Sequence, residues 1–175
     1  MRNILAIIIV SLISLSCKNE IKNKEENLKI NSKDEAEILN TINNVYNNIV
    51  VDSNKKPDYK TIKEQFIEHA CLGFISKDSL TLKNPIDYFD NMESMLSENK
   101  VEYLKEWEIQ GKTRLFGNIA QRTSLYGVHF NTTDSLAEKG IINFQLVKTK
   151  NEWKILSMIW ESEKGDLLVP DNYFE

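Results

Sequence analysis

The chain has 175 residues, of which 41% are hydrophobic and 27% are charged, an ordinary composition for a globular protein of one domain. Its 22 basic and 26 acidic residues give a net charge of −4. This argues against a nucleic-acid-binding protein, because such proteins carry concentrated basic patches. Two cysteines and two histidines leave no room for a zinc finger, an iron–sulfur site or a disulfide framework, so we expect neither a metal nor another cofactor.

The N-terminal segment has the pattern of an export signal. Arg2 precedes an almost wholly apolar run over residues 4–15. This run is too short to cross a bilayer, which needs about 20 residues, but it matches the apolar part of a secretory signal. The string SLSCK at residues 14–18 resembles the lipobox of bacterial lipoproteins, in which the signal is removed before the cysteine and the cysteine is acylated. We therefore expect a lipoprotein signal peptide over residues 1–16, lipidation at Cys17 and a location in the bacterial cell envelope, on the periplasmic or surface face of a membrane.

The alternative is a plain cleaved signal in which the cysteine is incidental. Residues 18–33 are mostly polar and cannot bury enough apolar surface to offset the entropy of ordering them. We expect residues 17–33 to be a flexible tether and residues 34–175 to form the folded domain.

Three amphipathic helices are predicted in the first half of this domain. Apolar residues recur at helical spacing over residues 38–49, and two further helices are expected over residues 59–69 and 85–97. Two short β-prone segments, residues 72–75 and 80–82, lie between the second and third helices. The apolar face of the third helix is predicted to consist of Ile86, Phe89, Met92 and either Met95 or Leu96.

In the second half of the domain, apolar residues recur at every second position, which is typical of strands. Four long strands are expected over residues 103–116, 118–130, 140–148 and 153–161, with a bulge or bend at Gly111. Short polar turns between long strands predict an antiparallel meander. The fold class is therefore α+β, with three N-terminal helices packed on a strongly curved, mostly antiparallel sheet that forms a cone-shaped half-barrel.

This order of elements resembles the nuclear transport factor 2-like, or cystatin-like, superfamily. The strings GNIAQ (117–121), GIINFQLV (140–147) and WKILSMIWE (153–161) are similar to the last three strands of its small bacterial members, with the polyketide-cyclase-like branch closest. The resemblance covers roughly residues 34–175. It implies a conical pocket with an apolar wall and a few polar groups, and a homodimer formed through the sheet. It implies no single activity, because isomerases, dehydratases, cyclases, epoxide hydrolases and non-catalytic binders share the fold.

Alternation along the predicted strands selects five candidate ligand contacts, which are Trp107, Arg122, Tyr126, Asn143 and Trp160. The three aromatic residues would form a pocket wall with polar groups at its edge, and the Asn143 amide would bond a ligand carbonyl or hydroxyl. The alternative is that the aromatic residues are ordinary core and that the amide faces solvent or a second copy. Strict alternation also puts Leu156 on the same face as Trp160.

A general base in this fold would be a carboxylate or histidine whose pKa an apolar pocket moves toward neutrality. Glu161, Asp87 and His129 are candidates, whereas Glu106 and Glu108 fall in a run of mixed charge and are not singled out. Because no acid and base can be paired, the favoured function is a membrane-anchored lipoprotein that binds a small, mostly apolar ligand. The alternatives are a cofactor-free acid–base enzyme of the cyclase, isomerase or dehydratase type, and a structural envelope lipoprotein with a filled cone.

Overall fold

The computed structural model describes residues 32–76 and 78–175, and every structural statement below concerns these residues. The predicted signal peptide, Cys17 and the predicted tether up to residue 31 lie outside them. The chain divides into two units, Met1–Ala36 and Glu37–Glu175, and the fold described here is that of the second. No helix in the described part of the chain is both long and apolar enough to cross a membrane.

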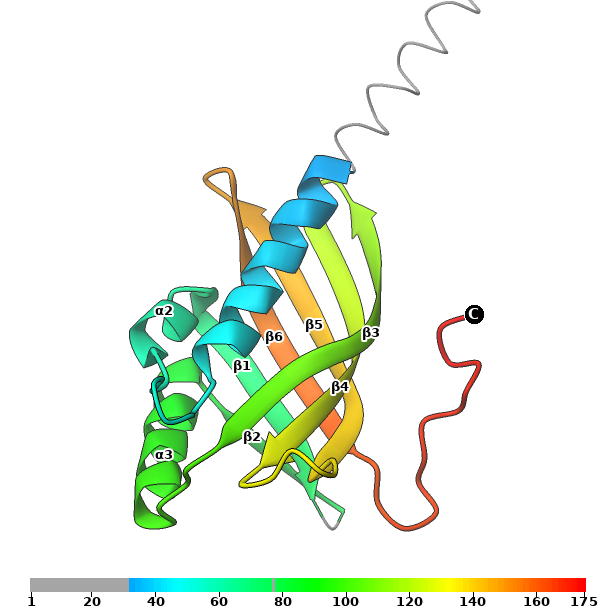
Figure 1. Cartoon of the computed structure of the whole chain (residues 1–175). Helices are drawn as coiled ribbons and strands as arrows, with labels where there is room; N and C mark the ends of the chain where they lie inside the picture. Colours follow the sequence, from blue (N-terminus) through cyan, green and yellow to red (C-terminus); the bar gives the residue numbers. More distant parts are fainter. Residues whose placement is uncertain (1–31, 77) are drawn as a thin grey trace, which may run out of the picture. The chain divides into compact units, whose positions relative to one another are not determined.

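The second unit is built from three helical segments and one sheet of six strands (Figure 1). Its first helix extends over residues 37–48. The labelled elements that follow are α2 (Tyr59–Lys63), β1 (Phe66–Ser76), β2 (Ser79–Lys83), α3 (Pro85–Glu98), β3 (Leu104–Phe116), β4 (Ile119–Phe130), β5 (Glu138–Thr149) and β6 (Glu152–Ser162). The strand order is β2-β1-β6-β5-β4-β3. Only β1 and β6 run parallel; the other pairs are antiparallel, which confirms the predicted mixed α+β class.

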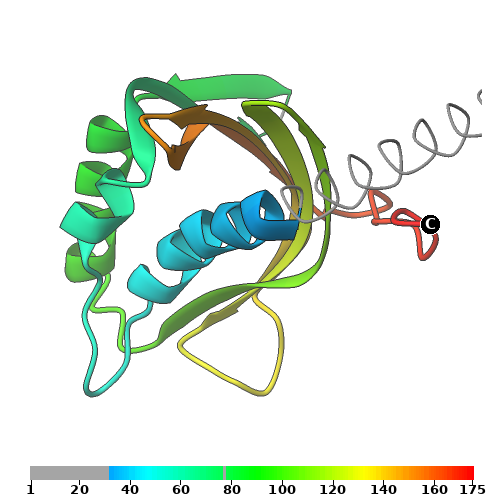
Figure 2. The same cartoon turned by 90° about the horizontal axis from the view of Figure 1, so that it is seen from above.

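The sheet curves around the helix over residues 37–48, which lies on its concave side (Figure 2). The residues of this helix that the spacing predicted to be buried are buried: Ile38, Ile42, Val45, Tyr46 and Ile49. Helix α3 contacts α2 and β1, at the side of the sheet where β1 lies. The predicted arrangement of helices on a strongly curved sheet is therefore confirmed.

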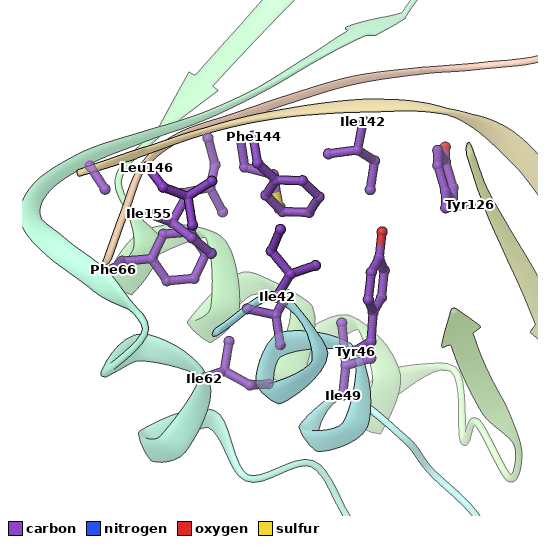
Figure 3. Packing of buried hydrophobic residues seen from close by; sticks show 14 of the residues in the cluster. Ile42, Tyr46, Ile49, Ile62, Phe66, Tyr126, Ile142, Phe144, Leu146 and Ile155 are labelled. Atoms are coloured by element: carbon purple, nitrogen blue, oxygen red, sulfur yellow. The ribbon is translucent and has the colours of Figure 1, made fainter. Parts of the chain in front are cut away.

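The core fills the space between the helix over residues 37–48 and the concave face of the sheet. Figure 3 shows Ile42 of this helix facing Phe144 and Leu146 of β5, and all three side chains are at most 1% exposed. Burying each such side chain stabilises the fold by roughly 1.5–3 kcal/mol. This packing holds the helix over residues 37–48 against the sheet. It thereby fixes the distance between the C-terminal end of this helix and the sheet.

The second predicted helix is too long. Helix α2 ends at Lys63, and the chain enters β1 at Phe66, so His69 lies in a strand. Asp58 caps the helix by accepting a hydrogen bond from the Thr61 amide. The strand that follows is decided by pairing rather than by local sequence, because Phe66 lies beside Ile155 in the parallel ladder with β6.

The third predicted helix is confirmed in its extent, but its buried face is different. Ile86 is 61% exposed, whereas Pro85, Phe89 and Leu96 are buried. The helix begins with Asn84, whose side chain accepts a hydrogen bond from the Asp87 amide. Ile86 follows the buried Pro85 in the first turn and points away from the core.

Two irregularities change which strand residues face the concave side. The β3–β4 register shifts between Glu108 and Gln110, just before the predicted bend at Gly111. The β5–β6 register shifts beside Leu156, which is 37% exposed while Ile155 is fully buried. The strict alternation predicted for this strand was therefore wrong at Ile155 and Leu156, because the bulge turns Ile155 to the concave face.

Candidate functional site

A cavity of about 260 Å³ lies on the concave side, between the C-terminal end of the helix over residues 37–48, helix α3 and the sheet. Two of its lining residues, Met95 and Glu138, are exposed, so the cavity opens to solvent beside them. Its other lining residues are Val45, Tyr46, Ile49, Tyr88, Phe89, Met92, Leu96, Leu104, Glu106, Tyr126, Val128, Phe130, Ile142, Phe144, Met158 and Trp160.

The sheet brings two carboxylates to this cavity in one row. Glu106 of β3 lies opposite Val128 of β4, and Val128 lies opposite Glu138 of β5. Directly opposed residues share a face of the sheet, and neighbouring strands are about 4.8 Å apart. The two glutamates therefore stand on either side of a small apolar side chain, about 10 Å apart at their Cα atoms.

Glu138 is held by two hydroxyl groups. The Tyr126 and Ser162 hydroxyls each donate to its Oε1 atom at 2.5 Å, and the two hydroxyl oxygens are 3.0 Å apart. Burial, together with the hydrogen bond to Glu138, raises the pKa of the Tyr126 hydroxyl well above its usual value. Tyr126 therefore stays protonated and keeps donating to the carboxylate.

Gly140 makes this arrangement possible. It lies between Tyr126 and Ser162 in the register, so no side chain separates the two hydroxyls. A Cβ atom at Gly140 would lie 2.3 Å from the Glu161 carbonyl oxygen and 2.7 Å from the Ser162 Cα. Both contacts are with backbone, so β6 approaches this closely only because residue 140 is glycine.

Glu106 has a different environment. It is half-buried, and no described side chain donates a hydrogen bond to its carboxylate. Burial, and then the like charge of Glu138, raises the pKa of Glu106 to about 8. At neutral pH the Glu106 side chain is therefore protonated for most of the time, whereas a glutamate side chain in water is ionised.

Aromatic side chains surround the two glutamates. The Tyr46 hydroxyl is 3.1 Å from the Ser124 Oγ, and Figure 3 shows the Tyr46 ring rising from its helix toward the sheet. Trp160 stacks on Phe74 at 5.3 Å and meets the edge of Tyr88 at 5.3 Å. Burial raises the pKa of both tyrosine hydroxyls, so neither ionises at physiological pH.

Arg122 lies on the concave face, and all three nitrogen atoms of its guanidinium group donate hydrogen bonds to neighbouring side chains. Its Nε and Nη2 atoms bond the two oxygens of Glu108 at 2.8 Å and 2.5 Å, and its Nη1 donates to the Thr113 hydroxyl at 2.6 Å. The Arg122 side chain is 7% exposed and that of Glu108 is 18% exposed. Arg122 does not line the cavity, because it is held by Glu108 and Thr113.

The structure brings two of the five predicted ligand contacts, Tyr126 and Trp160, into the lining of the cavity. Arg122 lies nearby in its ion pair. Trp107 and Asn143 do not line the cavity: Trp107 packs edge-on against His129 at 4.8 Å, and Asn143 accepts a hydrogen bond from the Thr123 hydroxyl at 2.8 Å. Both belong to the opposite, convex face.

The three residues proposed as a base also lie away from the cavity. Glu161 is exposed, Asp87 is in the first turn of α3, and His129 packs against Trp107. Sequence reasoning missed Glu106 and Glu138. The sequence did contain one indication for Glu106: it lies two residues after the apolar Leu104, so in a strand both side chains are on the same face.

A group of three histidine, cysteine, aspartate or glutamate side chains able to hold a metal ion does not occur among the described residues. The cavity lining offers two carboxyl groups and tyrosine hydroxyls. A protonated carboxyl group can donate a hydrogen bond or a proton, and a carboxylate can accept one.

Searches of protein-family models and of curated proteins give no match to this chain. Solved structures do match. A protein of unknown function with a cystatin-like fold from Nostoc punctiforme is 14% identical, covers 77% of this chain and 96% of its own, and has a TM-score of 0.60. A nuclear transport factor 2-like protein with a cystatin-like fold from Novosphingobium aromaticivorans is 12% identical, covers 83% and 91%, and has a TM-score of 0.63.

A candidate dehydratase of the nuclear transport factor 2-like family, from Streptomyces avermitilis, is 10% identical, covers 77% of this chain and 99% of its own, and has a TM-score of 0.58. At these identities the likeness concerns the fold. It agrees with the element order and the curved sheet described above. The chain has the cystatin-like fold of the nuclear transport factor 2-like proteins.

Proposed function

We propose that this chain binds a small, mostly apolar ligand in the cavity between the helix over residues 37–48, α3 and the sheet. The observation that carries the proposal is the cavity itself, about 260 Å³ in volume and lined by apolar and aromatic side chains around two carboxyl groups. An apolar protein cavity of about 150 Å³ already holds benzene, so this volume accommodates a larger molecule. A lining that is apolar with a few placed polar groups is typical of small-molecule sites.

The test is a calorimetric titration of the full chain with 2-phenylethanol, a neutral probe of suitable size. Val128→Phe adds bulk between the two glutamates and should weaken binding at least tenfold. Val147→Phe is the matched control, because Val147 lies on β5 outside this cavity, and it should bind as the wild type does. Thermal melts establish that each variant is folded. Equal binding by all three proteins, or no binding by the wild type, would overturn the proposal.

A second candidate function is acid–base catalysis on the bound molecule, and Glu106 favours it. A carboxyl group with a pKa of about 8 can donate its proton to a leaving hydroxyl near neutral pH, while Glu138 accepts one from carbon. Loss of water from a β-hydroxy ketone is a reaction of this kind. The structure from Streptomyces avermitilis, a candidate dehydratase, shares the fold, and this supports testing the reaction here.

The assay would follow the enone that forms from 4-hydroxy-4-phenylbutan-2-one by its ultraviolet absorbance. Glu106→Gln should slow the reaction by about 100-fold or more, the usual contribution of a general acid or base. Glu161→Gln, on the exposed convex face, is the control and should leave the rate unchanged. A wild-type rate no faster than that of buffer would exclude this substrate class and leave the binding proposal standing.

We also propose that the chain is a lipoprotein of the bacterial envelope, anchored to a membrane through Cys17. Support comes from the apolar run over residues 4–15, the lipobox-like string SLSCK at residues 14–18 and the polar stretch after it. In detergent-phase partitioning, the wild type and Cys71→Ala should enter the detergent phase, whereas Cys17→Ala processed in the same cells should not receive lipid. The same partitioning of all three would contradict lipidation.

A further inference from the structure

The charge on the cavity lining is of one sign. Among the described residues, its ionisable side chains apart from tyrosines are Glu106 and Glu138, and none is a lysine, arginine or histidine. Nearby basic groups are already paired: Arg122 with Glu108 on the concave face, and Lys139 with Glu163 at 3.0 Å. A ligand that enters the cavity therefore meets negative charge without a compensating cation.

The aromatic rings of the lining meet at steep angles and form corners. Tyr88 stands at 85° to Phe89, with ring centroids 5.1 Å apart, and at 78° to Trp160. Tyr46 stands at 84° to Phe144, with centroids 6.4 Å apart. The face of an aromatic ring is electronegative and attracts a nearby cation, so a lining rich in aromatic side chains is compatible with a positive charge.

Glu138 retains an oxygen for a ligand. The Tyr126 and Ser162 hydroxyls both donate to its Oε1 atom, and no described side chain donates to Oε2. The Glu106 carboxyl likewise receives no hydrogen bond from the described part of the chain. Two carboxyl groups with open oxygen atoms therefore line the same largely apolar cavity, which opens to solvent beside Glu138.

From this combination we propose that the ligand is a small organic cation: an apolar body that carries a protonated amine, bound between Glu106 and Glu138 and enclosed by the rings of Tyr88, Tyr126 and Trp160. The inference rests on the proposed binding function and names its ligand class. An ammonium group has up to three N–H donors, which suits two carboxylates on either side of it. The apolar body would occupy the part of the cavity lined by Phe89, Phe144 and Met158.

The other ligand classes fit less well. An anionic ligand would place a further negative charge beside Glu138, and beside Glu106 where that group is ionised, and like charges repel. A neutral ligand would leave the two glutamates facing each other, and Glu106 would keep its proton. A cation compensates both groups in a cavity whose lining is rich in aromatic side chains.

Binding of a cation should release a proton from Glu106. The titratable groups around the cavity are Glu106 itself, Glu138 on β5, Tyr126 on β4, Tyr88 on α3 and Tyr46 on the first helix, and the Arg122–Glu108 ion pair lies near Tyr46. A bound ammonium group would add an unpaired positive charge that favours the ionised form of Glu106. Amine affinity should rise with pH between about 6 and 8, while the amine stays protonated, and then level off.

The experiment compares three probes of nearly equal size on the full chain by titration calorimetry: 2-phenylethylamine, 2-phenylethanol and 3-phenylpropanoate. The amine should bind at least tenfold more tightly than the alcohol at pH 8, and the carboxylate should bind most weakly. At pH 7, buffers of different ionisation enthalpy should reveal proton release with the amine and none with the alcohol. Glu106→Gln should remove the proton release and most of the preference for the amine, whereas Glu161→Gln should change neither.

The outcomes separate this inference from the proposed function. Alcohol binding equal to or tighter than amine binding would overturn the inference and leave the proposed function intact. An amine preference that persists unchanged in Glu106→Gln, with this variant shown to be folded by its thermal melt, would place the cation elsewhere and also overturn the inference. Binding of none of the three probes would overturn both.

Discussion

Glu106 and Glu138 lie opposite the same residue, Val128, from the two strands on either side of β4. They share a cavity but not an environment. Glu138 accepts two hydrogen bonds from hydroxyl groups, whereas Glu106 accepts none from the described residues, and its pKa rises to about 8. These different surroundings, and the like charge of Glu138, favour a proton on Glu106 near neutral pH.

The raised pKa of Glu106 predicts how stability depends on pH. The group binds its proton more tightly in the folded state, with a pKa of about 8, than in the unfolded chain, where its pKa is 4.5. Its contribution is therefore fully present below pH 4.5 and is lost as the pH rises toward 8. Glu106→Gln cannot ionise, so the variant should be more stable than the wild type by on the order of 3 kcal/mol at pH 9.

The measurement is urea unfolding of both proteins from pH 5 to pH 9. The wild type should lose stability relative to Glu106→Gln as the pH rises, and the two curves should lie closest at pH 5. Glu161→Gln, which changes an exposed glutamate, should follow the wild type. A constant difference between wild type and Glu106→Gln across this range would contradict the raised pKa.

Replacing Gly140 should be costly. In Gly140→Ala the new Cβ would meet two backbone atoms of β6, at 2.3 Å and 2.7 Å, so the strands must separate. We expect a loss of about 3 kcal/mol in unfolding free energy, at the upper end of the range for overpacking. Gly127→Ala is the control, because its Cβ would meet only side-chain atoms at 3.1 Å or more, and it should lose less. Equal losses in denaturant unfolding would show that β6 can move away freely.

The buried pair of Arg122 and Glu108 should be strongly coupled. Arg122→Met removes the cation and leaves Glu108 largely buried without its partner, which should cost about 3–5 kcal/mol. In the double variant Arg122→Met, Glu108→Met both charges are gone, and much of this loss should be recovered. A double-mutant cycle by denaturant unfolding measures the coupling. Additive effects of the two substitutions would disprove it.

Two tryptophans provide a matched test of which face of the sheet binds. Trp160 lines the cavity and Trp107 packs on the convex face against His129. Trp160→Ala should weaken 2-phenylethanol binding about tenfold, because the probe loses an aromatic wall, whereas Trp107→Ala should leave it unchanged. Calorimetric titration of both variants, after their melts establish folding, decides the question. A larger effect from Trp107→Ala would move the site to the convex face.

Much of the fold follows from local patterns. The apolar spacing from Ile38 to Ile49 predicted the first helix and its buried face correctly, and the period of two after Asn99 predicted β3 to β6 within a few residues. Short polar turns predicted the antiparallel order of these four strands, which the ladders confirm. These features depend on residues within one turn or one strand of each other, so the sequence contains them directly.

Other features depend on residues far apart in the chain. Phe66 to His69 fit a helical pattern, but β1 forms there because it pairs with β6, about ninety residues later. The bulge beside Leu156 exists only in the register between β5 and β6, and it decides that Ile155 rather than Leu156 is buried. Pairing of this kind cannot be read from either strand alone.

The site depends on tertiary structure most of all. The sequence alone identified Tyr126 and Trp160 as aromatic residues at suitable strand positions, and it showed Glu106 as one charge in a mixed run. Only the register opposite Val128 brings Glu106 to Glu138, and only the packing of α3 and the first helix against the concave face shields Glu106 from water. A pKa of about 8 is produced by that desolvation and by the neighbouring charge. Both come from elements distant in the sequence, so the chemistry of the site arises when the chain folds.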